Sequence, residues 1–427
     1  MSAFAATLSD WLAHIERVHP RTIEMGLDRV RTVKDAMQLE PLMPLLIVGG
    51  TNGKGSACMM LEAILHQGGY RTGCYTSPHI TRYNERVRVA KLEADDDSLA
   101  RAFAAVEAAR LKAGVALTYF EFGTLAAVWL FIEQRVDVLI LEVGLGGRLD
   151  AVNVFEPDCA LVMSVDIDHV EYLGDTREKI GFEKAGIYRA GRPAICADAD
   201  PPRSLLEHAD KIGAQLMLVN RDYSHHAQAT QWRYRGPGGD RHGLPYPALR
   251  GAYQLGNAAA VIAALDTLRE RLPVTVNDIR TGLLDAENPG RFQVLPGQPM
   301  TILDVAHNPH AARALSQALG ALPRGGRTIA VFAMLGDKDI DGVIRVIMPR
   351  VDVWCVAGLE GARGTTAAQM TQRLKACGVV NGVHECVNVA EALNMAYGIA
   401  AESDKILIFG SFHTVSEATR AIQAIRK

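Results

Sequence analysis

Short apolar runs alternate with segments of helical spacing along most of the chain. The runs at residues 44–50, 136–144 and 159–166 have the length of strands. Their continuous apolar character suits parallel strands that are buried on both faces. Helical spacing follows or separates these runs at residues 53–69, 98–114 and 123–134. This alternation predicts an α/β fold with a parallel sheet.

Two irregular segments interrupt the pattern. Residues 221–251 are polar, aromatic and rich in Gly and Pro, which predicts loops and short antiparallel strands at the edge of the first domain. A helical pattern resumes over residues 257–272. Residues 288–300 then contain three prolines and two glycines, a composition typical of a domain boundary. We therefore expect one domain over residues 1–295 and a smaller one over residues 296–427.

The second domain repeats the alternation of strands and helices. Asn308 before Pro309 has the pattern of an N-cap followed by proline at the first helical position. This pattern predicts a smaller, Rossmann-like α/β domain at the C-terminus. Strands are expected at residues 301–306, 328–335, 351–358 and 405–412, and helices at residues 309–322, 341–348, 365–377 and 415–425.

Composition excludes several classes of protein. The chain has 427 residues, of which 48% are hydrophobic and 22% are charged, and its net charge is -3. Without a clustered basic face, we expect no nucleic-acid partner. The longest apolar stretches fall short of the ~18 residues that cross a membrane, and the first residues do not have the pattern of a signal peptide. The seven cysteines form no C-x-x-C pair, so we expect reduced thiols in a soluble, cytoplasmic protein.

A glycine-rich turn joins the first strand to the helix that follows it. Residues 45–56 have the sequence LLIVGGTNGKGS, which is close to the phosphate-binding P-loop pattern G-x-x-x-x-G-K-S/T. Here Gly55 follows Lys54, and Ser56 comes one position late. Backbone N–H groups at such a helix start bind anions, and Lys54 would reach the terminal phosphates. A glycine turn with a surface lysine is the alternative. The expected fold is therefore a P-loop N-terminal domain with a parallel sheet plus the smaller α/β domain.

The displaced serine means that a metal ion would need other ligands. Glu142 lies near the end of a predicted strand, and Asp166, Asp168 and His169 follow the next one. Ser77 and His79 follow a further strand at residues 70–76. Ligands of open α/β sheets bind at these carboxyl ends. Taken singly, Glu142 could instead cap a helix, and His169 could be an ordinary loop histidine.

Motifs in the same order over nearly the whole chain resemble one family. They are GTNGKGS, TSPH, NERVRV, ILEVGLGGRLDAVN, DH, EKAGI, NPGRFQ, DVAHNPH, GDKD and GSFHTV. Together they resemble the bifunctional dihydrofolate synthase/folylpolyglutamate synthase family of the Mur-ligase-like superfamily, and MGLDRV and TYFEFGT resemble its bacterial members. The resemblance implies that Ser77, Glu142 and His169 bind Mg²⁺, a reasonable donor set for a metal that keeps water and phosphate oxygens.

The resemblance implies an ATP-dependent ligase that joins L-glutamate to dihydropteroate or to a reduced folate. A carboxylate is a poor electrophile, so ATP would convert it to an acyl phosphate, which the amine of glutamate attacks. Lysine and Mg²⁺ would stabilise the charge on the transferring phosphoryl group. The implied ATP-binding residues are Thr51, Asn52, Gly53, Lys54, Gly55, Ser56, Asn257, Arg291 and Asp304. For two of them another interpretation is open: Arg291 as a linker arginine in a surface ion pair, and Asn257 as a helix N-cap.

The resemblance also assigns the other substrates. Asp304 and His307 are expected to contact ATP or glutamate, and His307 could accept the proton of the attacking amine. Ser411 resembles a glutamate contact, although a serine at that position is more often a helix cap. Phe120 could stack on the flat pterin ring or belong to the core. The residues expected around the pterin are Asp28, Arg29, Thr118, Phe120 and Asp150.

Lys184 in GFEKAGI is expected near the metal. A free ammonium beside Mg²⁺ is unfavourable, so the lysine either points away and pairs with Glu183 or a phosphate, or reacts with CO₂ to form an anionic carbamate. The resemblance favours the carbamate, which would act in catalysis and as a metal ligand. It further suggests two Mg²⁺ ions, a monovalent cation such as K⁺, and a monomer.

Two other functions remain to be distinguished. A muramyl-peptide-type ligase shares the mechanism, but it usually has an additional N-terminal domain, and the P-loop here begins near residue 49. A nucleotide-dependent switch is the rival from another class. A GTPase switch would need a guanine-reading N-K-x-D, which the sequence lacks.

Overall fold

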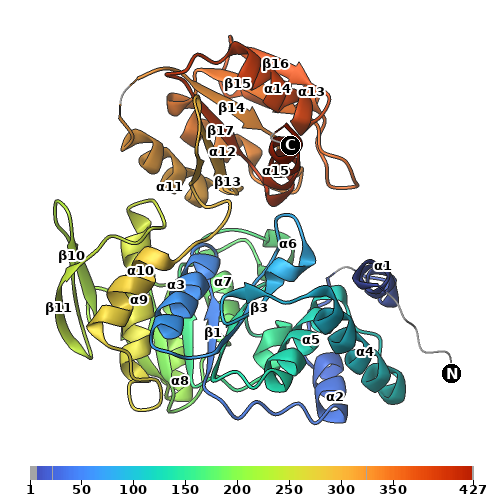
Figure 1. Cartoon of the computed structure of the whole chain (residues 1–427), viewed down its shortest axis with the longest axis vertical. Coiled ribbons are helices and arrows are strands. Elements are labelled where there is room, and N and C mark those ends of the chain that lie inside the picture. The colour runs from blue at the N-terminus through green and yellow to red at the C-terminus, as the bar shows by residue number, and fades with distance from the viewer. Residues whose placement is uncertain (1–6, 22, 324, 426–427) are drawn as a thin grey trace. The chain divides into compact units, whose positions relative to one another are not determined.

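The computed structural model describes residues 7–21, 23–323 and 325–425 (Figure 1). Contacts between residues divide the chain into two compact units. The N-terminal unit comprises Met1–Ala248 and Leu255–Glu287, and the C-terminal unit comprises Leu249–Gln254 and Asn288–Lys427. Each unit is built on its own largely parallel sheet with helices, so the predicted α/β class is confirmed.

The described part of the N-terminal unit has a sheet of eight strands in the order β4-β3-β2-β5-β1-β6-β7-β8. Strands β2, β5, β1, β6, β7 and β8 pair in parallel, whereas β3 and β4 add an antiparallel edge that the sequence analysis did not include. The strands are β1 Leu45–Gly49, β2 Thr72–Tyr75, β3 Val87–Val89, β4 Leu92–Glu93, β5 Val138–Glu142, β6 Cys159–Val162, β7 Pro193–Cys196 and β8 Gln215–Leu218.

Helices pack on this sheet, and one close approach depends on a glycine. A Cβ at Gly282 in α10 would lie 2.5 Å from Ile64 Cα in α3, so only glycine lets these helices pack so tightly. The α-helices are α1 Leu8–Val18, α2 Asp28–Ala36, α3 Lys54–Gln67, α4 Asp96–Ala113, α5 Tyr119–Glu133, α6 Val170–Leu173, α7 Arg177–Ala185, α8 Arg203–Ile212, α9 Tyr253–Thr267 and α10 Val276–Asp285. Two 3-10 helices are η1 Tyr83–Arg86 and η2 Ala151–Val154. No described helix is long and apolar enough to cross a membrane.

The irregular segment at residues 221–251 contains the antiparallel strands that were predicted. β9 Ser224–Ala227, β10 Trp232–Gly236 and β11 Gly239–Leu244 form a three-stranded antiparallel sheet (Figure 1). Asp266 in α9 anchors it by accepting hydrogen bonds from Tyr234 Oη and Gly238 N, both at 3.0 Å, and by pairing with Arg241.

The C-terminal unit has a six-stranded sheet among its described residues, in the order β12-β13-β17-β14-β15-β16. All its pairs are parallel except β12 with β13. The strands are β12 Gln293–Leu295, β13 Met300–Asp304, β14 Thr328–Phe332, β15 Val353–Ala357, β16 Val383–Cys386 and β17 Lys405–Phe409. The helices are α11 Pro309–Gly320, α12 Ile340–Ile347, η3 Met348–Arg350, α13 Ala367–Ala376, α14 Val389–Ile399 and α15 Phe412–Ile425.

Two local details bear on the sequence predictions. Asn308 is the N-cap of α11 and accepts a hydrogen bond from Ala311 N, with proline at the start of the helix, as predicted. The proline- and glycine-rich segment 288–300 contains β12, which pairs with β13 so that Val294 lies opposite Ile302. The division expected at residue 295 therefore falls inside a hairpin of the C-terminal sheet, because Pro and Gly also mark tight turns.

Candidate active site

The P-loop has the strand, turn and helix order that its sequence predicts. β1 ends at Gly49, and α3 begins at Lys54. Gly53 caps the helix with a φ of 90°, a conformation that glycine adopts without strain. Lys54 Nζ donates to Gly50 O at 3.0 Å and to Thr51 O at 3.2 Å. The ammonium group is therefore held over the turn, where the start of α3 favours an anion.

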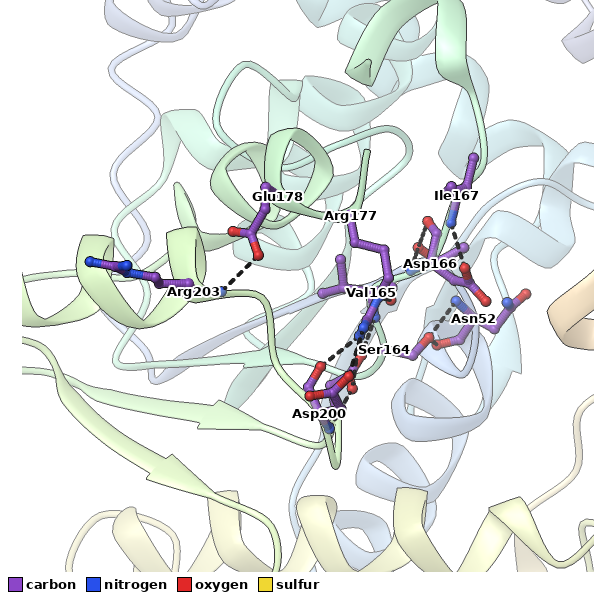
Figure 2. A network of polar contacts seen from close by, with 11 residues as sticks. Asn52, Ser164, Val165, Asp166, Ile167, Arg177, Glu178, Asp200 and Arg203 are labelled. Carbon is purple, nitrogen blue, oxygen red and sulfur yellow. Dashed lines mark hydrogen bonds and ion pairs between the residues drawn. The ribbon is translucent and has the colours of Figure 1, made fainter. Parts of the chain in front are cut away.

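The segment after β6 fixes the P-loop from behind. Ser164 O accepts from Thr51 N at 2.7 Å, and Ser164 Oγ accepts from Asn52 N at 3.0 Å. Thr51 Oγ1 donates to Asp166 O and accepts from Asp166 N, both at 3.0 Å. Figure 2 shows Asn52 beside Ser164 and Asp166. The Thr51 side chain thus shapes the loop, which leaves backbone N–H groups and Lys54 for phosphate.

Asn257 lies next to the same loop. It is in the second turn of α9, which begins at Tyr253, so the helix N-cap interpretation is wrong. A Cβ at Gly53 would lie 2.8 Å from Asn257 Oδ1. The structure therefore brings Asn257 to the P-loop, as expected of a nucleotide contact.

The three expected metal ligands come from three strand ends. Glu142 is the last residue of β5 and is buried, and its Oε2 accepts a hydrogen bond from Ser77 N at 2.9 Å. His169 caps α6 with a φ of 51°. Ser77 and His169 line one cavity. Among the described residues, no group of three or more His, Cys, Asp or Glu could hold a metal ion. The expected metal ligands include only two such residues, Glu142 and His169, together with Ser77. A carboxylate, a hydroxyl and an imidazole fit a divalent cation that keeps phosphate and water ligands.

The cavity has a volume of about 240 Å³. Phe120 forms one wall. Its ring lies so close to Gly144 that a Cβ at that residue would be only 2.7 Å from Phe120 Cζ. The ring centroid is also 5.8 Å from that of Tyr75, which is buried. Phe120 therefore both packs on the core and faces the cavity. The lining residues are Ile23, Glu24, Met25, Ser77, Pro78, Arg86, Thr118, Phe120, Glu121, Gly144, Leu145, Leu149, Asp150, Ala151 and His169.

A capping box ties this cavity to the N-terminal helices. Thr118 caps α5, and its backbone N–H donates to Glu121 Oε2 at 2.8 Å. Glu121 Oε1 accepts from Arg29 at 2.9 Å, and Glu24 Oε1 accepts from the same guanidinium at 2.8 Å. Arg29 is thus held behind the cavity wall. Asp28 does not line the cavity, and its carboxylate is exposed beside Arg31 on its own helix.

Asp150 and Lys184 are two buried ionisable groups near the P-loop. Asp150 Oδ2 accepts from Leu145 N at 2.8 Å and Oδ1 accepts from Val152 N at 3.1 Å, but burial raises the pKa of this carboxyl to about 7. Burial also lowers the pKa of Lys184 to about 7, with a smaller contribution from Lys54, while Asp168 and Asp150 oppose the shift.

The structure does not turn the side chain of Lys184 toward solvent. Lys184 is only 3% exposed. Glu183, its suggested partner, instead accepts from Arg148 Nη2 at 2.8 Å. With its pKa near 7, a large fraction of Lys184 is a neutral amine at neutral pH, and this is the form that reacts with CO₂.

The C-terminal unit gathers another group of predicted residues. Asp304 ends β13 and accepts from Phe292 N at 2.9 Å and from Ala306 N at 2.8 Å; burial raises its pKa, and Arg291 opposes the shift. The Arg291 guanidinium lies 5.2 Å from the centroid of the Phe412 ring.

His307 and Ser411 lie at strand ends of the same unit. The His307 ring is 6.3 Å from that of Phe412, and its Nδ1 lies 2.9 Å from Val305 O. Ser411 is buried and accepts from Thr414 N at 3.0 Å at the start of α15. The side chain of Ser411 therefore caps the start of α15, in agreement with the helix-cap interpretation.

Comparison with known proteins adds independent support. The Mur ligase middle domain family matches residues 48–265, and the Mur ligase, glutamate ligase domain family matches residues 290–412. The dihydrofolate synthase/folylpolyglutamate synthase of Escherichia coli (strain K12) is 43% identical over 423 residues, which cover 99% of this chain and 97% of that protein. The chain belongs to the dihydrofolate synthase/folylpolyglutamate synthase family. The resemblance seen in the motifs is thereby confirmed.

Solved structures of this family share the whole fold. Escherichia coli FolC in complex with DHPP and ADP superposes with a TM-score of 0.94 at 42% identity, and the match covers 100% of both chains. A bifunctional folylpolyglutamate synthase/dihydrofolate synthase with Mn, AMPPNP and L-glutamate bound gives a TM-score of 0.90 at 41% identity, covering 98% of each chain.

Within this family fold, the sequence analysis missed several residues that shape the site. Ser164 anchors the P-loop, while Arg86 and Glu121 line the cavity. Glu121 had a signal, because Thr118 and Glu121 have the spacing of a capping box. Ser164 and Arg86 had none, since their roles depend on which strands become neighbours.

Proposed function

We propose that the protein adds L-glutamate to dihydropteroate, giving dihydrofolate, and to reduced folates, giving polyglutamates. Membership of the family makes it an ATP-dependent amide ligase. The observation that supports the proposal best is the convergence, within one unit, of the P-loop, the Ser77–Glu142 contact and the cavity. A phosphate-binding turn therefore lies in the same unit as a partly aromatic cavity for a flat substrate.

The reaction needs activation of the substrate carboxylate. Its oxygen attacks the γ-phosphorus of ATP, the bond to the β-phosphate oxygen breaks, and ADP and an acyl phosphate form. The amine of glutamate then attacks the acyl carbon, and inorganic phosphate leaves as the amine loses a proton. Lys54 and the N–H groups at the start of α3 stabilise the charge on the transferring group. When a divalent cation is bound, Ser77, Glu142 and His169 would hold it, and it would neutralise phosphate charge.

The cavity offers groups that match a pterin. Phe120 lines the cavity, where its ring would stack on the flat pterin. Asp150 is held by Leu145 N and Val152 N at the cavity wall, where a carboxyl can pair with ring N–H groups. Thr118 lies at the same wall, and Arg29 acts through Glu24 and Glu121. A pterin contact by Asp28 remains a prediction, because Asp28 does not line the cavity.

The remaining assignments rest on the family and on local geometry. Asp304 and Arg291 lie close enough to interact in the C-terminal unit, and we assign both to ATP. His307 is the candidate acceptor of the amine proton, and Ser411 the candidate glutamate contact. We further infer two Mg²⁺ ions, with Lys184 as a carbamate at the second, and a monovalent cation such as K⁺. A cytoplasmic monomer completes the proposal.

The test is an assay of ADP release from ATP. Release should require L-glutamate together with dihydropteroate, and separately L-glutamate together with a reduced folate. Turnover with the folate alone would remove the dihydrofolate synthase activity from the proposal. Turnover with neither, but with a nucleotide-sugar peptide, would favour a muramyl-peptide-type ligase. Slow ATP hydrolysis that ignores all these substrates would favour a nucleotide switch.

A further inference from the structure

The loop after β5 and the last turn of α7 are packed backbone to backbone. Arg148 N donates to Glu183 O at 2.7 Å. A Cβ at Gly147 would lie 2.9 Å from Glu183 O and 3.0 Å from Lys184 O, so a larger residue would push the loop off the helix. The loop carries Asp150, and the helix carries Lys184. This contact is one of those that place the two buried groups relative to each other.

The carboxamide of Asn153 joins the two segments. Its Nδ2 donates to Arg148 O in the loop and to Gly186 O at the end of α7, both at 3.0 Å. Its Oδ1 accepts from Arg189 Nη2 at 3.0 Å. Asn153 is 6% exposed. One buried side chain thus satisfies a carbonyl on each side of the contact, and an unsatisfied buried carbonyl would be costly.

Arg189 reinforces the same junction from the outside. Its Nη2 also donates to Asn153 O at 3.1 Å and to Phe155 O at 3.3 Å, and its Nη1 donates to Gly186 O at 3.3 Å. Its Nε pairs with Glu156 at 2.6 Å. The guanidinium fork therefore fixes the orientation of the Asn153 amide, which a lysine could not do.

Asn153 reaches Asp150 through a single 3-10 turn. Asn153 N donates to Asp150 O at 2.9 Å, and Asp150 caps η2. Asp150 lines the cavity, whereas Asn153 does not. The other end of α7 is held separately, because Arg177 Nε donates to Val165 O at 2.9 Å (Figure 2). Loss of the Asn153 contacts would therefore loosen the C-terminal end of α7, where Arg148 N still donates to Glu183 O, while the start of the helix stays fixed.

We propose that Asn153 is a positioning residue of the ligase, with Arg189 as its support. It holds the loop that carries Asp150 against the helix that carries Lys184. It therefore affects binding of the pterin substrate through the position of this loop, without contacting the substrate. The inference rests on the proposed function, because it assumes that dihydropteroate binds in this cavity. It assigns to the buried amide a role in substrate affinity and in turnover.

The test compares Asn153→Ala and Asn153→Asp with the wild-type enzyme in the ADP-release assay. Asn153→Asp keeps the side-chain shape and the oxygen that accepts from Arg189. It replaces the NH₂ group that donates to Arg148 O and Gly186 O by a second acceptor oxygen. For both variants, KM for dihydropteroate should rise about tenfold and kcat should fall by about tenfold or more, because even small misplacements of catalytic groups lower the reaction rate strongly. KM for ATP should stay within about twofold, because the P-loop is anchored separately by Ser164.

Two controls separate positioning from stability. Thr275→Ala removes the N-cap of α10 in the same unit, so it should lower Tm without changing either KM. Arg189→Lys should show a weaker form of the Asn153 phenotype, and it provides a folded variant if Asn153→Ala does not fold. Wild-type KM values in the folded Asn153 variants, or an equal rise in both KM values, would overturn the inference. A wild-type enzyme inactive with dihydropteroate would instead defeat the proposed function.

Discussion

Lys184 should reduce the stability of the folded protein, because its amine is buried. Its amine is buried, and its pKa is about 7 in the folded chain against an ordinary value of 10.5. Between these values the unfolded chain binds more protons, so stability rises with pH. From the two values, burial of the amine costs about 4 kcal/mol at pH 7 and about 2 kcal/mol at pH 9.

Lys184→Met replaces the amine by an apolar chain of similar length. We expect the variant to be more stable than the wild type by about 2–4 kcal/mol at pH 7, and this difference should shrink as the pH approaches 10. Urea denaturation in CO₂-free buffers from pH 7 to pH 9.5 measures it. Lys179→Met is the matched control, since the Lys179 side chain is 62% exposed on the same helix. Parallel profiles for wild type and Lys184→Met would refute the reasoning.

The same variants test the carbamate without an activity measurement. Bicarbonate should stabilise the wild type, because CO₂ would react with the folded amine, and it should leave Lys184→Met unchanged. Lys184→Ala should lose most activity, and short carboxylic acids should partly restore it. An unchanged wild-type denaturation curve at high bicarbonate, or an unmodified, solvent-pointing lysine in a high-resolution density map, would rule the carbamate out.

Three further variants address the rest of the molecule. Lys54→Ala should keep the fold but lower kcat by about 10²-fold or more, whereas a small change in kcat would show that the lysine does not act on the phosphoryl group. Glu142→Gln should raise the Mg²⁺ concentration needed for half-maximal activity, because it removes the charge beside Ser77; wild-type kinetics at low Mg²⁺ would refute the metal assignment. Asp266→Asn should cost about 3 kcal/mol in urea denaturation, since it leaves Arg241 without its buried partner, and a loss below about 1 kcal/mol would contradict that view.

Much of the fold could be predicted because its signals are local. Continuous apolar runs at β1, β5 and β6 identified buried parallel strands, and the cap residue Asn308 fixed the start of α11. The antiparallel edge β3–β4 was missed because such short strands have no periodicity of their own. β12 was also missed, because proline and glycine in its segment indicated a linker.

The candidate site divides in the same way. Lys54 and its turn could be predicted because the P-loop depends on consecutive residues, and order along the chain placed Ser77, Glu142 and His169 at strand ends. The strand order of the sheet, which places β2, β5, β1 and β6 side by side, decided that Ser77 contacts Glu142 and that Ser77 and His169 line one cavity. Burial decided the rest. Only the folded chain buries Lys184 and brings it near Lys54, which lowers its pKa to about 7, and only the packed helix end gives the Asn153 amide its two carbonyls. Such effects depend on long-range neighbours, which spacing along the sequence does not specify.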